Sequence, residues 1–211
     1  MLAEAEAAGL EFDLVAVREG EDFTARTGKH VTLSRAVFRA VTQTVTPQGV
    51  IAIAKVDEAD AKAAVAAARR RRWPLVVLDG IQDPGNVGAI CRSAAAAGAP
   101  ALAVLEGSAD PYGAKAVRAS AGNVFRLTVA RATWNDLVEL DGYGAAASGG
   151  EPLADAPVEK AGLIVLGSVA HGLSRSDLKL VTVHLSEGVE SLNVAAAAAL
   201  ILFEVKRRLA A

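Results

Sequence analysis

The sequence predicts an α/β fold with a mostly parallel sheet over residues 73–211. Short apolar runs alternate there with alanine-rich stretches that favour helix, and glycines or prolines separate the two. The runs are apolar throughout and do not alternate with polar residues, which is typical of parallel strands buried on both faces.

Residues 1–56 predict a small α+β domain. We expect a strand over residues 12–17, a short helix over 34–41 capped by Ser34, and a strand over 49–56. Domains below about 60 residues are marginally stable on their own. We therefore expect part of this domain to be missing from the chain.

Residues 57–72 predict a linker helix with Asp57 or Asp60 as its N-cap, and residues 73–211 predict the larger domain. The expected strands of that domain cover residues 75–80, 101–107, 125–130, 142–149, 163–168 and 179–185. The expected helices cover residues 87–98, 113–122, 134–140 and 192–209.

The composition is that of an ordinary soluble protein, with 211 residues, 52% of them hydrophobic, and a net charge of −2. A single cysteine, Cys91, excludes a disulfide framework, and the three histidines lack metal-ligand spacing. No apolar stretch reaches the roughly 20 residues of a membrane helix, and the acidic N-terminus does not fit a secretory signal. We expect a cytoplasmic protein without a metal or a membrane segment.

Basic residues concentrate in the middle of the chain: residues 61–131 carry 10 basic and 4 acidic side chains. The densest part, Arg69–Arg72 followed by Trp73, could contact an RNA backbone and stack on a base. A solvated helix end before Pro74 is the simpler interpretation of this run taken alone. If the run binds RNA, we expect it to form one face with Lys115, Arg118 and Arg126 beside residues 86–92.

Three loops follow expected strands and lead into segments with hydrogen-bonding side chains. They lie in LDGIQDPGNVGAICRSAAAAG (78–98), LIVLGSVAHGLS (163–174) and VTVHLSEGVESLNVAAAAALILFEVKRR (181–208). Each alone could be an ordinary capped loop, and neither a dinucleotide fingerprint nor a P-loop is present. Together, and with DPYGAKAVRASAGNVFRL between the first two, they resemble the three motifs of the SpoU (TrmH-type) RNA 2'-O-ribose methyltransferases of the SPOUT superfamily. The resemblance covers residues 75–208, and TPQGVIAIAKV (46–56) is similar to the end of the family's N-terminal substrate-binding domain.

This resemblance implies a Rossmann-like sheet with a C-terminal deep trefoil knot, preceded by a partial RNA-binding domain over residues 1–56. It also implies S-adenosylmethionine as cofactor and a homodimer whose active site lies near the subunit interface.

Ala195, Ala198, Ala199 and Leu202 recur at helical spacing, so we expect this face of the last helix to be buried.

The resemblance also assigns roles to individual residues. Those expected to position the substrate and act in catalysis are Asn86, Arg92, Ser191 and Asn193. Those expected at the cofactor are Gly167, Val183, Leu192, Leu166 and Leu185, with Ser148 and Gly149 in a first knot loop. The charge pattern, and not the resemblance, gives the residues expected to bind RNA, which are Arg69, Arg70, Arg71, Arg72 and Arg118.

The role of Arg92 has two interpretations. A ribose 2'-hydroxyl is a weak nucleophile, so methyl transfer needs removal of its proton and in-line placement of the reacting atoms. The family proposal makes the arginine the proton acceptor, although a guanidinium stays protonated in proteins. The alternative is a bidentate clamp on the adjacent phosphate, with Asn86 holding the ribose.

Two positions depart from the family pattern: Val169 replaces a usual glutamate, and His184 stands where proline usually precedes the third loop. Loss of the carboxylate removes a hydrogen-bond acceptor from the knot. The expected function is 2'-O-methylation of ribosomal RNA. The alternatives are a transfer RNA substrate, or a weakly active or non-catalytic RNA-binding relative.

Overall fold

The computed structural model describes residues 1–42, 48–168 and 172–210. The chain divides into two units, Leu2–Asp57 and Glu58–Ala211. No helix among the described residues is both long enough and apolar enough to cross a membrane.

The smaller unit is built on a three-stranded sheet of order β2-β1-β3, in which β1 is parallel to β2 and antiparallel to β3. Its elements are α1 (Leu2–Ala7), β1 (Phe12–Arg18), β2 (Lys29–Leu33), α2 (Arg35–Val41) and β3 (Val50–Ala54). Ser34 caps α2 as predicted, and Phe38 of this helix is buried. β2 is not predicted from the sequence, because its residues, KHVTL, are mostly exposed and form no apolar run.

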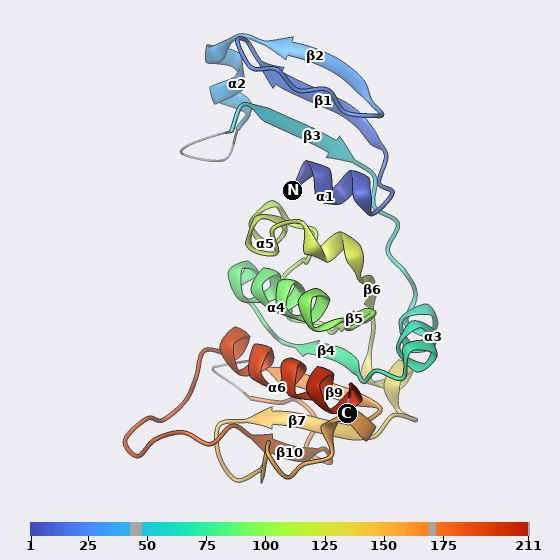
Figure 1. The fold of residues 1–211 in the computed structure, drawn as a ribbon, viewed down its shortest axis with the longest axis vertical. Helices are drawn as coiled ribbons and strands as arrows, with labels where there is room; N and C mark the ends of the chain where they lie inside the picture. Colours follow the sequence, from blue (N-terminus) through green and yellow to red (C-terminus); the bar gives the residue numbers. More distant parts are fainter. Residues whose placement is uncertain (43–47, 169–171, 211) are drawn as a thin grey trace. The chain divides into compact units, whose positions relative to one another are not determined.

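A seven-stranded parallel sheet of order β6-β5-β4-β9-β7-β10-β8 forms the centre of the larger unit (Figure 1). Its strands are β4 (Leu75–Asp79), β5 (Ala101–Val104), β6 (Thr128–Arg131), β7 (Gly142–Ala146), β8 (Glu151–Pro152), β9 (Leu163–Gly167) and β10 (Lys179–Thr182). Every residue of β4, β5 and β9 is buried, as the unbroken apolar runs predict. The predicted α/β class and parallel sheet are confirmed.

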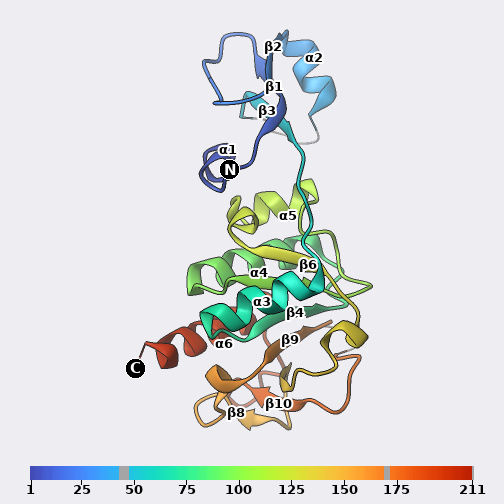
Figure 2. The same ribbon diagram turned by 90° about the vertical axis from the view of Figure 1, so that its right-hand side faces the viewer.

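Helices cover both faces of this sheet (Figure 2). They are α3 (Ala61–Arg71), α4 (Pro84–Ala97), α5 (Ala114–Ala119) and α6 (Val194–Leu209), with 3-10 turns at Asn123–Arg126, Trp134–Leu137 and Val158–Lys160. Val76 and Leu78 of β4 share one core cluster with α4, α5 and α6, whereas Leu75 and Val77 share the other with α3. The side chains of a strand alternate between faces, so α3 lies on the face opposite to α4 and α5.

Two predicted helices differ in the structure. The helix expected over residues 134–140 is a single 3-10 turn, held by a capping box between Thr133 and Asp136. The last helix begins at Val194, because Asn193 is its N-cap. Of its predicted alanine-rich face, Ala198 and Leu202 are buried, but Ala195 and Ala199 are only half-buried.

Arg208 near the end of α6 ties this helix to the segment before β9. Its guanidinium contacts Glu204 at 2.6 Å and Glu159 at 3.4 Å, and donates to the carbonyl oxygens of Leu153 and Ala154. Hydrogen bonds from Arg207 and then Arg208 lower the pKa of Glu204 from 4.5 to about 2.

We expect this network to make stability depend on acid pH. A lowered carboxyl pKa in the folded state means that the stabilisation is complete above pH 4.5 and is lost as the pH falls toward 2. Glu204→Gln should lose about 1 kcal/mol of unfolding free energy at neutral pH, a modest value because the network borders solvent. Urea titrations across this range should show the wild-type and Glu204→Gln curves converging in acid. A constant gap between them would contradict the assignment.

Candidate active site

All predicted cofactor residues except Leu192 end or follow three strands that reach the same edge of the sheet. Ser148 and Gly149 follow β7, Gly167 ends β9, and Val183 and Leu185 follow β10. These strands are parallel to one another, so the loops that follow them emerge at one edge, the carboxyl edge. Leu166 differs from the others because its side chain is fully buried in the core.

The loop after β9 folds back closely onto the end of its own strand. A Cβ atom at Gly167 would lie 2.5 Å from the carbonyl oxygen of Gly172, so only glycine fits there. The N–H of Gly172 donates to the carbonyl oxygen of Ser168 at 2.8 Å and closes the loop. Val169, the departure from the family pattern, lies outside the described residues.

A buried carboxylate fixes the far end of this loop. Asp79 ends β4 and is only 5% exposed, and its two oxygens accept hydrogen bonds from the N–H and the hydroxyl of Ser174, at 2.6 and 2.8 Å. The Trp134 indole N–H donates to the same hydroxyl at 2.8 Å, and the Arg175 guanidinium lies 5.3 Å from the Trp134 ring centre. Neither Asp79 nor Ser174 is among the site residues predicted from the sequence, although an acidic residue at the end of an apolar strand is a usable signal.

The structure brings together two of the four predicted catalytic residues. Asn193 caps α6 by accepting from the N–H of Ala195 at 2.8 Å, and its side-chain N–H donates to the Asn86 oxygen at 3.1 Å. This bond joins the first predicted motif to the third, 107 residues apart. Ser191 is exposed in the loop just before Asn193.

Arg92 lies apart from this pair. It is exposed on α4, six residues after Asn86, which places it about 9 Å further along the helix and about 120° around it. Among the described residues, no hydrogen bond joins Arg92 to Asn86, Ser191 or Asn193. Within one chain, its guanidinium therefore faces solvent.

The cations of residues 61–131, which we call the basic island, divide between the two faces of the sheet. Arg69–Arg72 end α3 and precede the amino end of β4, whereas Arg92, Lys115 and Arg118 lie on α4 and α5, across the sheet. The expectation of a single basic face beside residues 86–92 is wrong, because the crossover between β4 and β5 places α4 on the face opposite to α3.

Lys115 already has a partner within the chain. Lys115 pairs with Asp83, the N-cap of α4, at 2.7 Å, and this bond is the main cause of a lowered Asp83 pKa. The Asp83 carboxylate at the start of α4, the helix that holds Asn86 and Arg92, is therefore paired with the ammonium group of Lys115.

The residues at the carboxyl edge fit S-adenosylmethionine. Val183, Leu185 and Leu192 are half-buried, so each offers part of an apolar side chain beside the polar backbone of its loop. Apolar contact surfaces with a few backbone donors and acceptors are what an adenine ring requires. His184, the second departure, is exposed within the same loop. No group of His, Cys, Asp and Glu side chains in the described part of the chain is arranged to hold a metal ion.

Comparison with known proteins agrees with this arrangement. Residues 74–203 match the model of the SpoU rRNA Methylase family. The chain is 34% identical over 185 residues to the 23S rRNA (guanosine(2553)-2'-O)-methyltransferase RlmP of Bacillus subtilis, covering 82% of this chain and 71% of that protein. It is 36% identical over 146 residues to an uncharacterized tRNA/rRNA methyltransferase of Mycobacterium tuberculosis, covering 64% of this chain and 45% of that protein.

Solved structures show the same fold. The SpoU methyltransferase AviRb from Streptomyces viridochromogenes, in complex with AdoMet, superposes with a TM-score of 0.83 at 25% identity, over 100% of this chain and 88% of that one. The family match covers more than half of the chain and includes both ends of the Asn86–Asn193 contact. The chain therefore belongs to the SpoU rRNA methylase family.

Proposed function

We propose that this protein transfers a methyl group from S-adenosylmethionine to a ribose 2'-hydroxyl of ribosomal RNA. The observation that carries the proposal is the hydrogen bond between Asn86 and Asn193, formed by the start of α4 and the N-cap of α6. Membership of the family and the 34% identity to a ribosomal RNA 2'-O-methyltransferase support it.

The residues of this chain supply positioning and proton transfer. The bound cofactor supplies an electrophilic methyl group on a sulfonium. Asn86 and Asn193 hold the ribose so that its 2'-oxygen lies in line with that methyl, and Ser191 lies in the adjacent loop. Arg92 lies apart from this pair within one chain, so we assign it to a substrate bound near the subunit interface of the homodimer proposed below, either as the acceptor of the 2'-hydroxyl proton or as a clamp on the neighbouring phosphate.

We also assign residues 1–56 to RNA substrate binding, residues 57–72 to a linker helix and residues 73–211 to catalysis, with a trefoil knot near the C-terminus. The strand order supports the knot: β7 lies between β9 and β10, so the chain crosses β7 after leaving β9 and then returns to pack α6 on α4.

The test is methylation of purified ribosomal RNA with labelled cofactor, followed by mapping of the modified nucleotide. The expected result is one labelled ribose in ribosomal RNA and none in transfer RNA. Label in transfer RNA alone would show that transfer RNA, and not ribosomal RNA, is the substrate. RNA binding without cofactor binding or label would favour a non-catalytic relative, the alternative that Val169 suggests.

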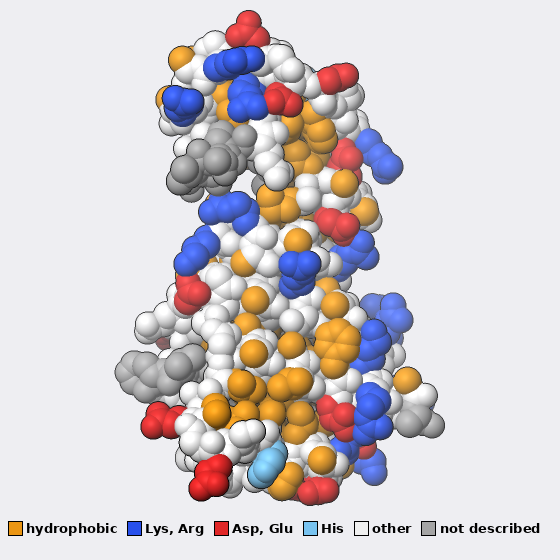
Figure 3. Space-filling view, turned by 60° about the vertical axis from the view of Figure 1, so that its left-hand side comes forward, with side chains coloured by type: hydrophobic (Ala, Val, Ile, Leu, Met, Phe, Trp, Pro, Cys, Tyr) orange, Lys and Arg blue, Asp and Glu red, His pale blue; other side chains and the backbone are white. Residues whose placement is uncertain are grey.

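We further propose a homodimer, which an exposed apolar face of α6 supports. Leu200 and Phe203 lie one turn apart on this helix and are 48% and 46% exposed. Figure 3 shows hydrophobic side chains gathered on one face of the larger unit. Burying such side chains against a second copy is a strong driving force for association.

Leu200→Glu and Phe203→Glu should each weaken the dimer at least about 100-fold, because the new carboxylate would be buried without a partner. Light scattering should then give the monomer mass at concentrations where wild type is dimeric. Val138→Glu is the control. Val138 is an exposed hydrophobic residue at the end of the 3-10 turn Trp134–Leu137 and lies outside α6, so this substitution should leave the dimer intact. A monomeric wild type would refute the proposal.

A further inference from the structure

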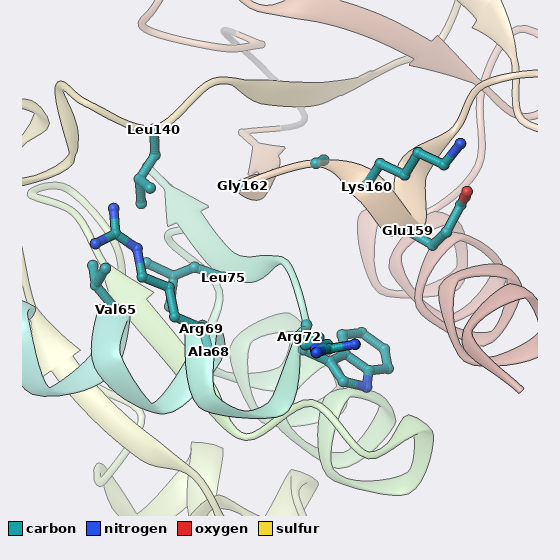
Figure 4. Close-up of a pocket in the computed structure, with 11 residues that line it drawn as sticks. Val65, Ala68, Arg69, Arg72, Leu75, Leu140, Glu159, Lys160 and Gly162 are labelled. Carbon is teal, nitrogen blue, oxygen red and sulfur yellow. The ribbon is translucent and has the colours of Figure 1, made fainter.

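A hollow of about 260 Å³ lies at the amino ends of β4 and β9, at the edge of the sheet opposite to the candidate active site (Figure 4). The end of α3, the start of β4 and the turn before β9 line it. In Figure 4, Arg69 and Leu140 lie on one side of the hollow, and Glu159 and Lys160 lie on the other. We call it the amino-edge hollow.

The amino-edge hollow carries an excess of positive charge. Arg69, Arg72 and Lys160 line it and are exposed, and none of them takes part in an ion pair within the described residues. Its one acidic side chain, Glu159, already binds Arg208 at 3.4 Å. The three cations are therefore available to an anion.

Arg72 occupies a backbone conformation that favours glycine. It ends α3 with φ 53° and ψ 39°, and the N–H of Trp73 closes the turn on the carbonyl oxygen of Ala68 at 3.0 Å. Helices that end in this left-handed conformation most often place glycine there, because other residues are strained. An arginine at this position keeps a guanidinium at the hollow despite the strain, a combination found at functional sites.

The remaining walls suit a planar ring. Trp73 is half-buried, and the half-buried Leu140 adds apolar surface. Aromatic side chains beside cations bind nucleic acid by stacking on a base while the cations hold its phosphate. The volume is just below the roughly 300 Å³ at which small-molecule pockets begin, so the hollow has room for no more than about one nucleotide.

We propose that the amino-edge hollow binds one nucleotide of the RNA substrate, with its base against Trp73 and its two flanking phosphates among Arg69, Arg72 and Lys160, which lie around the hollow. This inference rests on the proposed RNA substrate. The five-residue strands between the hollow and the carboxyl edge span roughly 15 Å, so the contact involves a nucleotide other than the methylated one. It also separates Arg69 and Arg72, which line the hollow, from Arg70 and Arg71, which do not.

The test measures binding of a labelled single-stranded oligouridylate by the full chain at several salt concentrations. Arg72→Gly removes the guanidinium and suits the positive φ, so this variant should be at least as stable as wild type. We expect Arg72→Gly and Lys160→Ala each to weaken binding about tenfold and to reduce the salt dependence by about one phosphate contact. Lys62→Ala is the matched control: this exposed cation lies near the start of α3, does not line the hollow, and its loss should change affinity less than threefold.

Equal RNA affinity of wild type, Arg72→Gly and Lys160→Ala would overturn the inference while leaving the proposed function intact. An equal loss in the Lys62→Ala control would also overturn it, since it would indicate a general basic surface. Uridine 5'-monophosphate that binds at the hollow without displacing the oligouridylate would show a free-nucleotide site instead. A wild type that binds no RNA at all would refute the proposed function as well.

Discussion

Arg92→Ala is expected to reduce the rate of methyl transfer by about 100-fold to 10,000-fold, the usual contribution of a positioned proton-transfer or charge-stabilising group. Its affinity for S-adenosylmethionine should stay within about twofold of wild type. Arg92 is exposed on α4, whereas the residues assigned to the cofactor come from the strand ends and loops of the carboxyl edge and from Leu192. An effect confined to kcat identifies an interaction made mainly in the transition state.

Single-turnover assays and calorimetric titration of the cofactor measure the two quantities separately. Arg118→Ala, an exposed arginine on α5, is the control and should change RNA affinity far more than kcat. Arg92→Lys separates the two roles of the arginine: a lysine keeps the charge of a phosphate clamp but not its bidentate geometry, so a clamp should be partly retained. Equal losses of cofactor affinity and turnover in Arg92→Ala would place Arg92 in the cofactor pocket.

Asp79→Ala is expected to lower the free energy of unfolding by about 3 kcal/mol and to weaken cofactor binding at least about tenfold. The substitution removes the acceptor of two short hydrogen bonds from Ser174, and bonds to a charged acceptor contribute about 1.5–3 kcal/mol each. The loop that follows Gly167 then loses its anchor to β4. Asp79 acts through that loop, so it is a positioning residue.

Urea unfolding and cofactor titration of the same samples test this expectation. Ser174→Ala removes only the hydroxyl and should cost about half as much stability. Asp177→Asn removes an exposed carboxylate that pairs with Arg175 and should stay within about 0.5 kcal/mol of wild type. Normal cofactor affinity in a destabilised Asp79→Ala variant would show that the anchor serves stability alone.

Local sequence patterns account for most of the larger unit. The buried strands β4, β5 and β9 are unbroken apolar runs, and side-chain caps at Asp60 and Asp83 mark the starts of α3 and α4. The strand order does not follow from such local patterns. β7, with the sequence GYGAA, lies beside β9 because Gly142 lets the strands approach: a Cβ there would lie 2.1 Å from the Leu163 carbonyl oxygen. Such a contact between distant segments leaves no periodic signal.

The candidate site shows the same division between local and distant information. The resemblance to the family identified Asn86 and Asn193, and the structure joins them. The roles of Asp79 and Ser174 depend on a contact between the end of one strand and the loop after another, so no single motif contains both. The split of the basic island depends on which face each helix covers, which the charge pattern does not encode.

The bond between Asn86 and Asn193 also bears on the order in which this chain folds. It joins residues 107 positions apart, and the neighbouring central strands β4 and β9 are similarly distant in sequence. Closing such long loops costs entropy before any contact forms, so chains rich in them fold slowly. The two asparagines meet only after α6 has docked on α4. In a chain diluted out of denaturant, methyl transfer should therefore return later than helical circular dichroism.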